Sequence, residues 1–381
     1  MSEKNFINMH VLISHSPSCL NRDDMNMQKT GVFGGLTRVR ISSQSLKRAM
    51  RTSDYYKSNF SRSTRTRYLV EKFVKDALAS CNDNKRAEQI EQTGLYMAAL
   101  IEGKTKLEEV KKYKRAESGR IEHQVLPFHE SEVAEIRDLF SAAIDQPEEK
   151  RIDFLKKEFK TVEDRQKSKV TLDVAIAGRM ATSDILYPID GSVAIAHSIT
   201  THAVEPQDID WFTAVDDLVN DAGETGAGHL NTQQFSAGVF YRYASLNLQQ
   251  LQKNLGDVPR ERSLDVARHL FHMLVTVVPA AKQQSFAAHN VSDFSIVSFG
   301  HQPISLANAF EEPVEANKSG GYLAPSISRL ADYWRRMDTA YELNELAAVF
   351  DPDAQATHDS LLTLHKLSKV ENWIAADGKR T

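Results

Sequence analysis

The chain contains few cysteines and no long apolar run, and both absences limit what it can be. Cys19 and Cys81 are the only cysteines among 381 residues, and their spacing fits neither a metal site nor a disulfide framework. This usage is typical of a reducing compartment, so we expect a cytoplasmic protein. The N-terminus shows no signal-peptide pattern. No apolar run is long enough to span a bilayer, so we expect no membrane partner.

Compact catalytic and nucleotide-binding motifs are also absent. The sequence has no GxxxxGK(S/T), GxSxG or HExxH motif. His197 and His202 have no cysteine or carboxylate partner at zinc-ligand spacing, which favours hydrogen-bonding or core histidines. Asp23 and Asp24 could hold magnesium for phosphodiester cleavage, but no third carboxylate follows at a suitable spacing, and a turn is favoured. We therefore expect no cofactor and no metal site.

Positive charge is concentrated in one part of an otherwise acidic molecule. The net charge is −4, yet residues 22–76 hold 13 lysines and arginines against 5 acidic residues. The chain is therefore not expected to coat nucleic acid with its whole surface. A basic segment on an acidic molecule is typical of a local polyanion site. A second basic stretch, residues 150–169, fits a nucleic-acid contact and an exposed helix with ion pairs equally well.

Residues 38–51 carry the most informative local pattern, a short strand followed by an amphipathic helix. Charged and apolar residues alternate over 38–41, which predicts the strand. Ser42 or Ser43 can cap the helix. Leu46 and Met50 lie one turn apart and are expected to face inward, while Lys47 and Arg51 form a basic row on the exposed side. Hydroxyls, free amides and paired cations suit a phosphate, although a solvated basic face is the simpler alternative.

Apolar periodicity predicts an α+β chain. Residues 55–165 are rich in charged residues and have apolar residues at helical spacing, which predicts a helical subdomain that is inserted or appended. The other expected elements are strands at 5–13, 172–176, 192–197, 235–246 and 294–299 and helices at 261–278, 326–338 and 358–375. Without the insertions the order is strand, helix, strand, strand, helix, strand, the split βαβ arrangement of many RNA-binding sheets. The aromatics are not at the positions that a simple RNA-recognition module uses for base stacking, so RNA binding would depend on loops and the basic helix.

Residues 201–230 differ from the rest of the chain. They contain 7 acidic residues, 4 glycines or prolines, and no lysine or arginine, which predicts a protruding hairpin or a long loop. Trp211 and Phe212 could pack within this hairpin or act as exposed wedges. The negative charge would be repelled by RNA and would suit a basic surface on another copy of the chain. Such a head-to-tail contact builds an open filament.

Several long segments together resemble the CasC family, the backbone subunits of the type I-E CRISPR Cascade complex. They are Phe6–Lys29, Val39–Met50, Gly178–Ser183, Ile209–Leu218 and Gly238–Tyr243. The resemblance implies a modified RNA-recognition (ferredoxin-like) palm, an inserted helical fingers domain and a protruding β-hairpin thumb. The implied boundaries are a palm at 1–54, 169–200 and 234–381 with C-terminal helices, fingers at 55–168 and a thumb at 201–233.

The resemblance also implies a function. Such a subunit is non-catalytic, binds CRISPR RNA and polymerises head to tail along the guide spacer. It presents the guide in short segments for pairing with target DNA in antiviral defence. The implied partners are CRISPR RNA, the target DNA strand, further copies of the chain and the Cascade subunits CasA, CasB, CasD and CasE. Related type III backbone subunits cleave RNA with a loop aspartate, so a metal-dependent endoribonuclease using Asp23 and Asp24 is the alternative.

Position by position, the resemblance assigns a set of RNA contacts. These are Arg22, Lys29, Ser42, Gln44, Lys47, Arg48, Arg51, Met180, Phe212, Thr213, Lys282 and Gln283. The chain departs from the family pattern at Leu36 and Thr37, where basic residues are expected. It departs again at Ala280, where a glycine would let the backbone approach RNA more closely.

Overall fold

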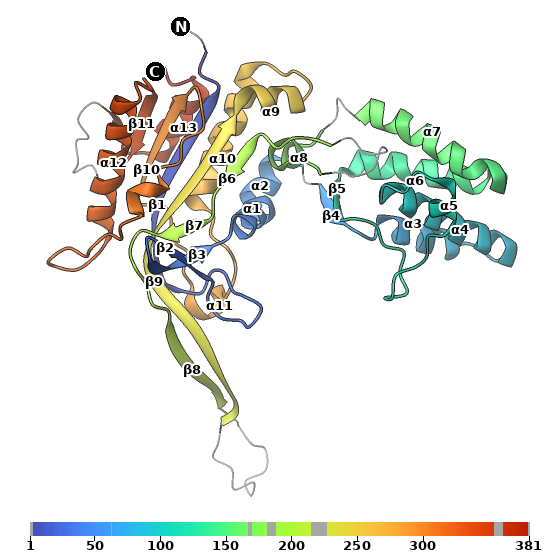
Figure 1. Ribbon diagram of the computed structural model, residues 1–381, viewed down its shortest axis with the longest axis horizontal. Helices are drawn as coiled ribbons and strands as arrows, with labels where there is room; N and C mark the ends of the chain where they lie inside the picture. Colours follow the sequence, from blue (N-terminus) through green and yellow to red (C-terminus); the bar gives the residue numbers. More distant parts are fainter. Residues whose placement is uncertain are drawn as a thin grey trace, which may run out of the picture. The chain divides into compact units, whose positions relative to one another are not determined.

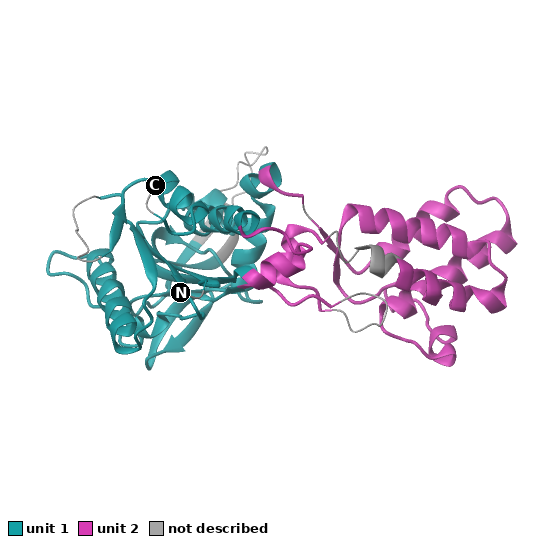
Figure 2. Ribbon diagram, turned by 90° about the horizontal axis from the view of Figure 1, so that it is seen from above, with its two compact units in different colours: residues 1–58, 194–248, 261–381 teal, residues 59–193, 249–260 magenta. Residues whose placement is uncertain are grey.

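A computed structural model describes residues 3–61, 63–166, 170–180, 188–214, 227–353 and 361–379 (Figure 1). The chain is mixed α+β and divides into two compact units (Figure 2). Unit 1 comprises Met1–Ser58, Ala194–Leu248 and Glu261–Thr381, and unit 2 comprises Asn59–Val193 and Gln249–Arg260. Within these ranges no helix combines the length and the apolar character that crossing a membrane requires.

Unit 1 is built on a large mixed sheet. Its main path runs β12-β11-β10-β1-β9-β7-β3-β2, and β6 and β8 pair with β9 off this path. Main-path neighbours are antiparallel, except that β11 and β12 are parallel. The strands are β1 (Phe6–Ser18), β2 (Thr30–Phe33), β3 (Leu36–Ile41), β6 (Val193–Ile195), β7 (Ser198–Thr200), β8 (Gln207–Ala214), β9 (Ala227–Asn247), β10 (Phe294–Gly300), β11 (Leu346–Phe350) and β12 (Leu362–Leu364).

The middle of this sheet contains a split βαβ order of elements. Along the chain come β1, α1 (Ser43–Thr52), β7, β9, α10 (Arg260–Thr276) and β10. The four strands are neighbours in the order β10-β1-β9-β7. The strands expected near 5–13, 235–246 and 294–299 are confirmed. The second strand of the motif is β7 rather than residues 172–176.

The expected strand at 172–176 is wrong, because these residues form helix α8 (Leu172–Ala177) in unit 2. A short apolar run bounded by turn residues fits a buried strand and a buried helix equally well, so its periodicity does not decide. The Asp173 carboxylate accepts hydrogen bonds from the backbone N–H of Ser63 at 3.2 Å and from its hydroxyl. The helix ends at Gly178, whose φ of 78° favours glycine.

One face of the unit 1 sheet is covered by the segment that follows β10. The 3₁₀ helix η1 (Ala307–Phe310) and helix α12 (Leu323–Ala340) pack there, burying Phe310 and Trp334 against Tyr241 of β9. Arg242, the next residue of β9, faces the other side and donates hydrogen bonds to Leu274 of α10 and to Val277 just beyond it. The sheet is therefore a middle layer between α10 and the η1–α12 segment.

The acidic segment forms the predicted hairpin where it is described. β8 pairs with β9 from Gln207 opposite Phe235 to Ala214 opposite Ala227, and we call this pair the arm. Figure 1 shows the arm extending away from the rest of the sheet. Residues 215–226 lie outside the described part of the chain.

The C-terminal region was predicted only in part. Helix α12 is confirmed, but β11 was not predicted, and the helix expected at 358–375 is shorter, α13 (Leu367–Ala375). Strand β12, which pairs with β11, occupies residues at the start of the predicted helix. Further short helices are α2 (Asp54–Asn59), α9 (Leu248–Asn254) and α11 (Gln283–Phe286).

Unit 2 is largely helical and has its own core. Its helices are α3 (Leu69–Leu78), α4 (Asn84–Ile101), α5 (Leu107–Lys111), α6 (Glu130–Ile144), α7 (Glu148–Gln166) and α8, with a small sheet of β4 (Thr64–Thr66) and β5 (Leu126–Phe128). Phe73, Phe140 and Phe159 belong to one buried cluster. Arg151, in the basic stretch 150–169, is buried and donates to the carbonyls of Ala143 and Gln146, so that arginine is structural.

Candidate nucleic-acid interface

Unit 1 contains a cavity of about 370 Å³ between the loop after β1, helix α1 and the turn after α10. We call this cavity the groove. Two of the predicted RNA contacts, Arg22 and Arg48, line it together with Ala280, one of the departures from the family pattern. The lining residues are Leu20, Asn21, Arg22, Asp23, Asn26, Ser45, Arg48, Ala49, Thr52, Pro279, Ala280 and Ala281.

The start of α1 follows the sequence prediction. Ser42 is the N-cap, and its hydroxyl accepts a hydrogen bond from the backbone N–H of Ser45 at 3.2 Å. Leu46 and Met50 are buried, as their one-turn spacing predicts. Because Ser42 is itself buried and occupied as a cap, its main role is to begin the helix that carries Arg48.

The exposed side of α1 is not the predicted row. Gln44 and Arg48 are exposed, whereas Lys47 and Arg51 are half-buried and make contacts within the protein. Successive helical residues are 100° apart, so a side chain two positions from the buried row points away from it, and one position away lies on its flank. The correct outward pair is therefore Gln44 and Arg48.

Asn21, which the sequence analysis did not select, links the parts of the groove. Its side-chain oxygen accepts a hydrogen bond from the Ser42 backbone N–H at 2.8 Å, and its carbonyl accepts one from Lys29 N–H at 2.9 Å. The neighbouring Arg22 donates to Asn26 at 2.8 Å. One asparagine thus fixes the loop with Arg22 to the start of α1. No sequence pattern pointed to it, since the bond to Ser42 joins segments 21 residues apart and the bond from Lys29 forms only when the loop folds back.

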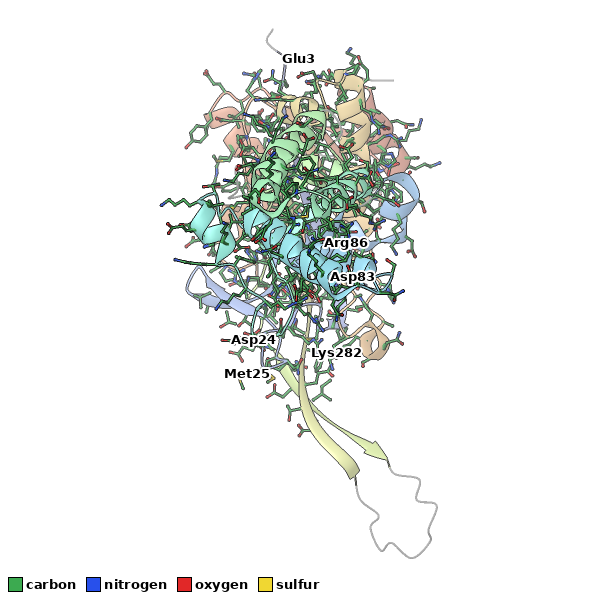
Figure 3. The ribbon with its side chains drawn as sticks, turned by 90° about the vertical axis from the view of Figure 1, so that its right-hand side faces the viewer. Glu3, Asp24, Met25, Asp83, Arg86 and Lys282 are labelled. Carbon is green, nitrogen blue, oxygen red and sulfur yellow. The ribbon has the colours of Figure 1, made fainter. Side chains whose placement is uncertain are left out.

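Asp23 is held as a turn residue. One oxygen of its carboxylate accepts hydrogen bonds from the backbone N–H groups of Met25 and Met27, both at 2.9 Å. Asp24 is exposed. Figure 3 shows Asp24 and Met25 at the end of unit 1 where the arm begins. Among the described residues, no group of three or more histidine, cysteine or acidic side chains could hold a metal ion.

Lys282 follows directly after Ala281, the last residue of the turn that lines the groove. Figure 3 labels it. Burial raises the pKa of the Cys19 thiol, and the positive charges of Arg22 and Lys282 act on that pKa in the opposite direction. Both cations therefore lie near the same buried thiol. Gln283 is different, because its side chain is hydrogen-bonded within its own loop to Pro279 and Ala288.

Lys29 belongs to a second cationic group on the β2–β3 side of unit 1. Arg40 lies 3.0 Å from a ring nitrogen of His197, and its backbone N–H donates to the Lys29 carbonyl at 2.9 Å. Burial lowers the pKa of His197, and the charges of Arg40 and Lys29 lower it further. This keeps the imidazole neutral beside two cations. Arg40 was part of the predicted strand but was not selected as a contact.

Arg38, in the same strand, is buried and unavailable to a ligand. It is 1% exposed and donates to the carbonyls of Thr200 and Phe310, both at 3.0 Å. Burial also lowers the pKa of its guanidinium. The chain thus uses Arg38 to attach β3 to β7 and η1, which fixes the strand that leads into α1.

Three further predicted contacts belong to other parts of the chain. Met180 is in unit 2, and 87% of its surface is exposed. Phe212 and Thr213 are in β8, where the Phe212 backbone is opposite Leu230, but their side chains lie outside the described part of the chain.

The aromatic side chains on the middle strands of the sheet are buried, so they are not placed for base stacking, in line with the sequence interpretation. His10 of β1 stacks on Tyr243 of β9 with ring centres 5.2 Å apart, and it hydrogen-bonds the Tyr241 hydroxyl at 2.9 Å. The Leu306 N–H also donates to that hydroxyl. Because η1 and α12 cover this face, bases cannot stack on it.

An α+β protein with this fold resembles chains of CRISPR RNA-guided surveillance complexes. One solved chain, titled "CRISPR RNA-guided surveillance complex, pre-nicking", superposes with a TM-score of 0.79 at 23% identity, covering 98% of this chain and 100% of that chain. Another, titled "CRISPR RNA-guided surveillance complex", gives a TM-score of 0.69 at 21% identity, with coverage of 97% and 99%. The model of the CT1975-like protein family matches residues 7–374, and the chain belongs to this family. No curated protein matches it.

Proposed function

We propose that this chain is a non-catalytic, cytoplasmic backbone subunit of a type I-E Cascade complex that binds CRISPR RNA through the groove. The observation that carries the proposal is the convergence of Arg22, Arg48 and Lys282 at one place. In the part of the chain that the structure describes, none of the three forms an ion pair. Membership of the CT1975-like family and the likeness to chains of surveillance complexes support the same role.

The chemistry of the groove suits an RNA backbone. Two guanidinium groups can each bind a phosphate in a bidentate manner, and an ammonium group adds a point charge beside them. These contacts carry no base specificity, so any guide sequence would be accepted. Base pairing between guide and target would then supply the sequence information, as in other RNA-guided effectors.

The remaining parts have corresponding proposed roles. The unit 1 sheet would be the palm, unit 2 the fingers and the arm the thumb. The acidic arm would dock on a basic surface of the next copy, with Phe212 and Thr213 covering a kink in the RNA. Met180 would press against bases, and CasA, CasB, CasD and CasE would complete the complex with the target DNA strand. An exposed methionine is soft and adaptable enough for such contacts.

Assembly with CRISPR RNA tests this proposal directly. We expect the chain, co-expressed with a CRISPR RNA, to purify as an arc or filament in which several copies protect the spacer from nuclease. A matched variant with residues 208–232 replaced by a short glycine-serine loop should still bind RNA but should not form the filament, because the arm joins the copies. Electron microscopy and RNA footprinting measure both outcomes. RNA-free monomers from the unmodified chain would contradict the backbone role.

A cleavage assay addresses the endoribonuclease alternative. We expect complementary RNA and magnesium to give no site-specific cuts with the assembled complex, because the Asp23 carboxylate is bonded to loop amides. Asp23→Ala should weaken guide binding by opening the loop of Arg22, whereas Asp24→Ala at an exposed position should not. Cuts that either substitution abolishes would refute the non-catalytic role.

A further inference from the structure

The loop after α10, residues 277–290, has an unusual backbone. Helix α11 lies within it, between two non-glycine residues in the left-handed region, Lys282 with φ of 56° and Ala287 with φ of 48°. L-residues with side chains rarely adopt this conformation. It persists only where surrounding contacts impose it, and such residues are concentrated at binding sites. The contacts that impose it here are therefore of functional interest.

Gln283 supplies a contact across the neck of this loop. Its side-chain nitrogen donates to the Pro279 carbonyl at 3.2 Å and to the Ala288 carbonyl at 3.1 Å. Both partners are acceptors, so the amide nitrogen must be the atom that faces them. The amide oxygen of Gln283 is buried and has no partner among the described residues. Both ends of the amide thus face the interior of the loop, and neither is presented to a ligand.

The two ends of the loop are fixed separately. At the start, the buried Arg242 donates to the Val277 carbonyl at 2.9 Å. At the end, the Asn290 side-chain oxygen accepts from the backbone N–H of Ser16 at 3.3 Å. Between these points, the Gln283 side chain links the Pro279 side of the loop to its Ala288 side. Without it the Pro279 and Ala288 sides of the loop would lose this side-chain link, and the conformation at Lys282 would depend on the backbone bonds that its carbonyl accepts from Ser285 and Phe286, both at 3.1 Å.

We propose that Gln283 is a positioning residue, which closes the loop and holds Lys282 toward the groove, and that it does not itself touch RNA. This assigns Gln283 a role different from the backbone contact that the family resemblance implies. The effect on RNA affinity rests on the proposed function, whereas the effect on the loop does not. Lys282 is then the RNA contact, and Gln283 acts through it.

Hydrogen exchange on the free protein tests the loop. The amides of Phe286 and Ala287 donate to carbonyls within the loop, at 3.1 and 2.8 Å. In Gln283→Ala we expect both to exchange at least tenfold faster. Gln284→Ala is the matched control, since Gln284 is the same residue type at the next position and is exposed. Equal exchange rates in Gln283→Ala and the unmodified chain would overturn the inference.

A double-mutant cycle on RNA binding then separates positioning from contact. Lys282→Ala, Gln283→Ala and the double variant are compared by filter binding of single-stranded RNA over a salt series. If Gln283 acts through Lys282, all three lose affinity by a similar factor, and all three lower the slope of log K against log salt by about 0.7. Additive losses, with an unchanged slope for Gln283→Ala, would show a direct contact and overturn the inference. Full affinity in Lys282→Ala would instead refute the proposed RNA contact of this loop, while the exchange result still decides the role of Gln283.

Discussion

Replacing Arg22, Arg48 and Lys282 together by alanine is expected to weaken binding of single-stranded RNA by about 10³-fold or more. Each cation would otherwise make a charge-assisted phosphate contact, and such hydrogen bonds contribute about 1.5 kcal/mol or more each. The triple variant should also lower the slope of log K against log salt by about 2, since one single-strand phosphate contact accounts for about 0.7. Filter binding over a salt series measures both quantities.

A charge-matched control is available in the same unit. Lys318, Arg336 and Lys369 are exposed, lie outside the groove lining, and carry the same total charge as the three groove cations. Replacing them by alanine should leave the salt slope unchanged. Equal losses in both triple variants would mean that net charge rather than the groove governs binding. Circular dichroism on both variants checks that each is folded.

The outcome depends on which cations of α1 face outward, and this could be predicted only in part. The N-cap Ser42 and the buried Leu46 and Met50 follow from local patterns, because capping and one-turn spacing involve neighbouring residues. The sequence analysis placed Lys47 and Arg51 in the outward row. The geometry of a helix instead places Gln44 and Arg48 farthest from the buried side. The information was in the sequence, and the pattern was interpreted incorrectly.

Other features depend on segments that are distant in the chain, so no local pattern contains them. Arg38 is buried because the carbonyls of Thr200 and Phe310 lie across it. Asn21 joins Ser42 and Lys29 only after the loop has folded back. The neighbours Lys282 and Gln283 look alike in the sequence as polar residues of one turn, yet the second faces inward. The resemblance points to this region as the interface but does not distinguish the roles of these two neighbours.

Acidification is expected to destabilise unit 1 through His10 and His15. Both are nearly fully buried, and burial lowers the pKa of each from 6.5 to about 3. The unfolded chain binds a proton at each histidine below pH 6.5, whereas the folded chain does not until about pH 3. Stability is therefore complete above pH 6.5 and falls as the pH drops. Between pH 7 and pH 5 each histidine should cost about 2 kcal/mol.

Variants isolate this contribution from other titrating groups. Burial raises the pKa values of Asp293 and Glu345, so their protonation favours the folded state and partly opposes the histidines. In His10→Gln the loss of stability between pH 7 and pH 5 should be smaller than in the unmodified chain by about 2 kcal/mol. The exposed His301→Gln is the control. Exchange of β1 amides measures the stability of unit 1, and parallel pH profiles for His10→Gln and the unmodified chain would contradict the prediction.

His15 extends this argument to the loop of Lys282. Its Nε2 accepts a hydrogen bond from Arg242 at 3.1 Å, and the same guanidinium donates to the Val277 carbonyl where the loop of Lys282 begins. A protonated His15 cannot accept that bond and would repel Arg242, whose burial already lowers its pKa to about 10. Acid should therefore loosen the loop before unit 1 unfolds. We expect the amides of Phe286 and Ala287 to lose protection at a higher pH than those of β1, because releasing one loop costs less free energy than unfolding the sheet.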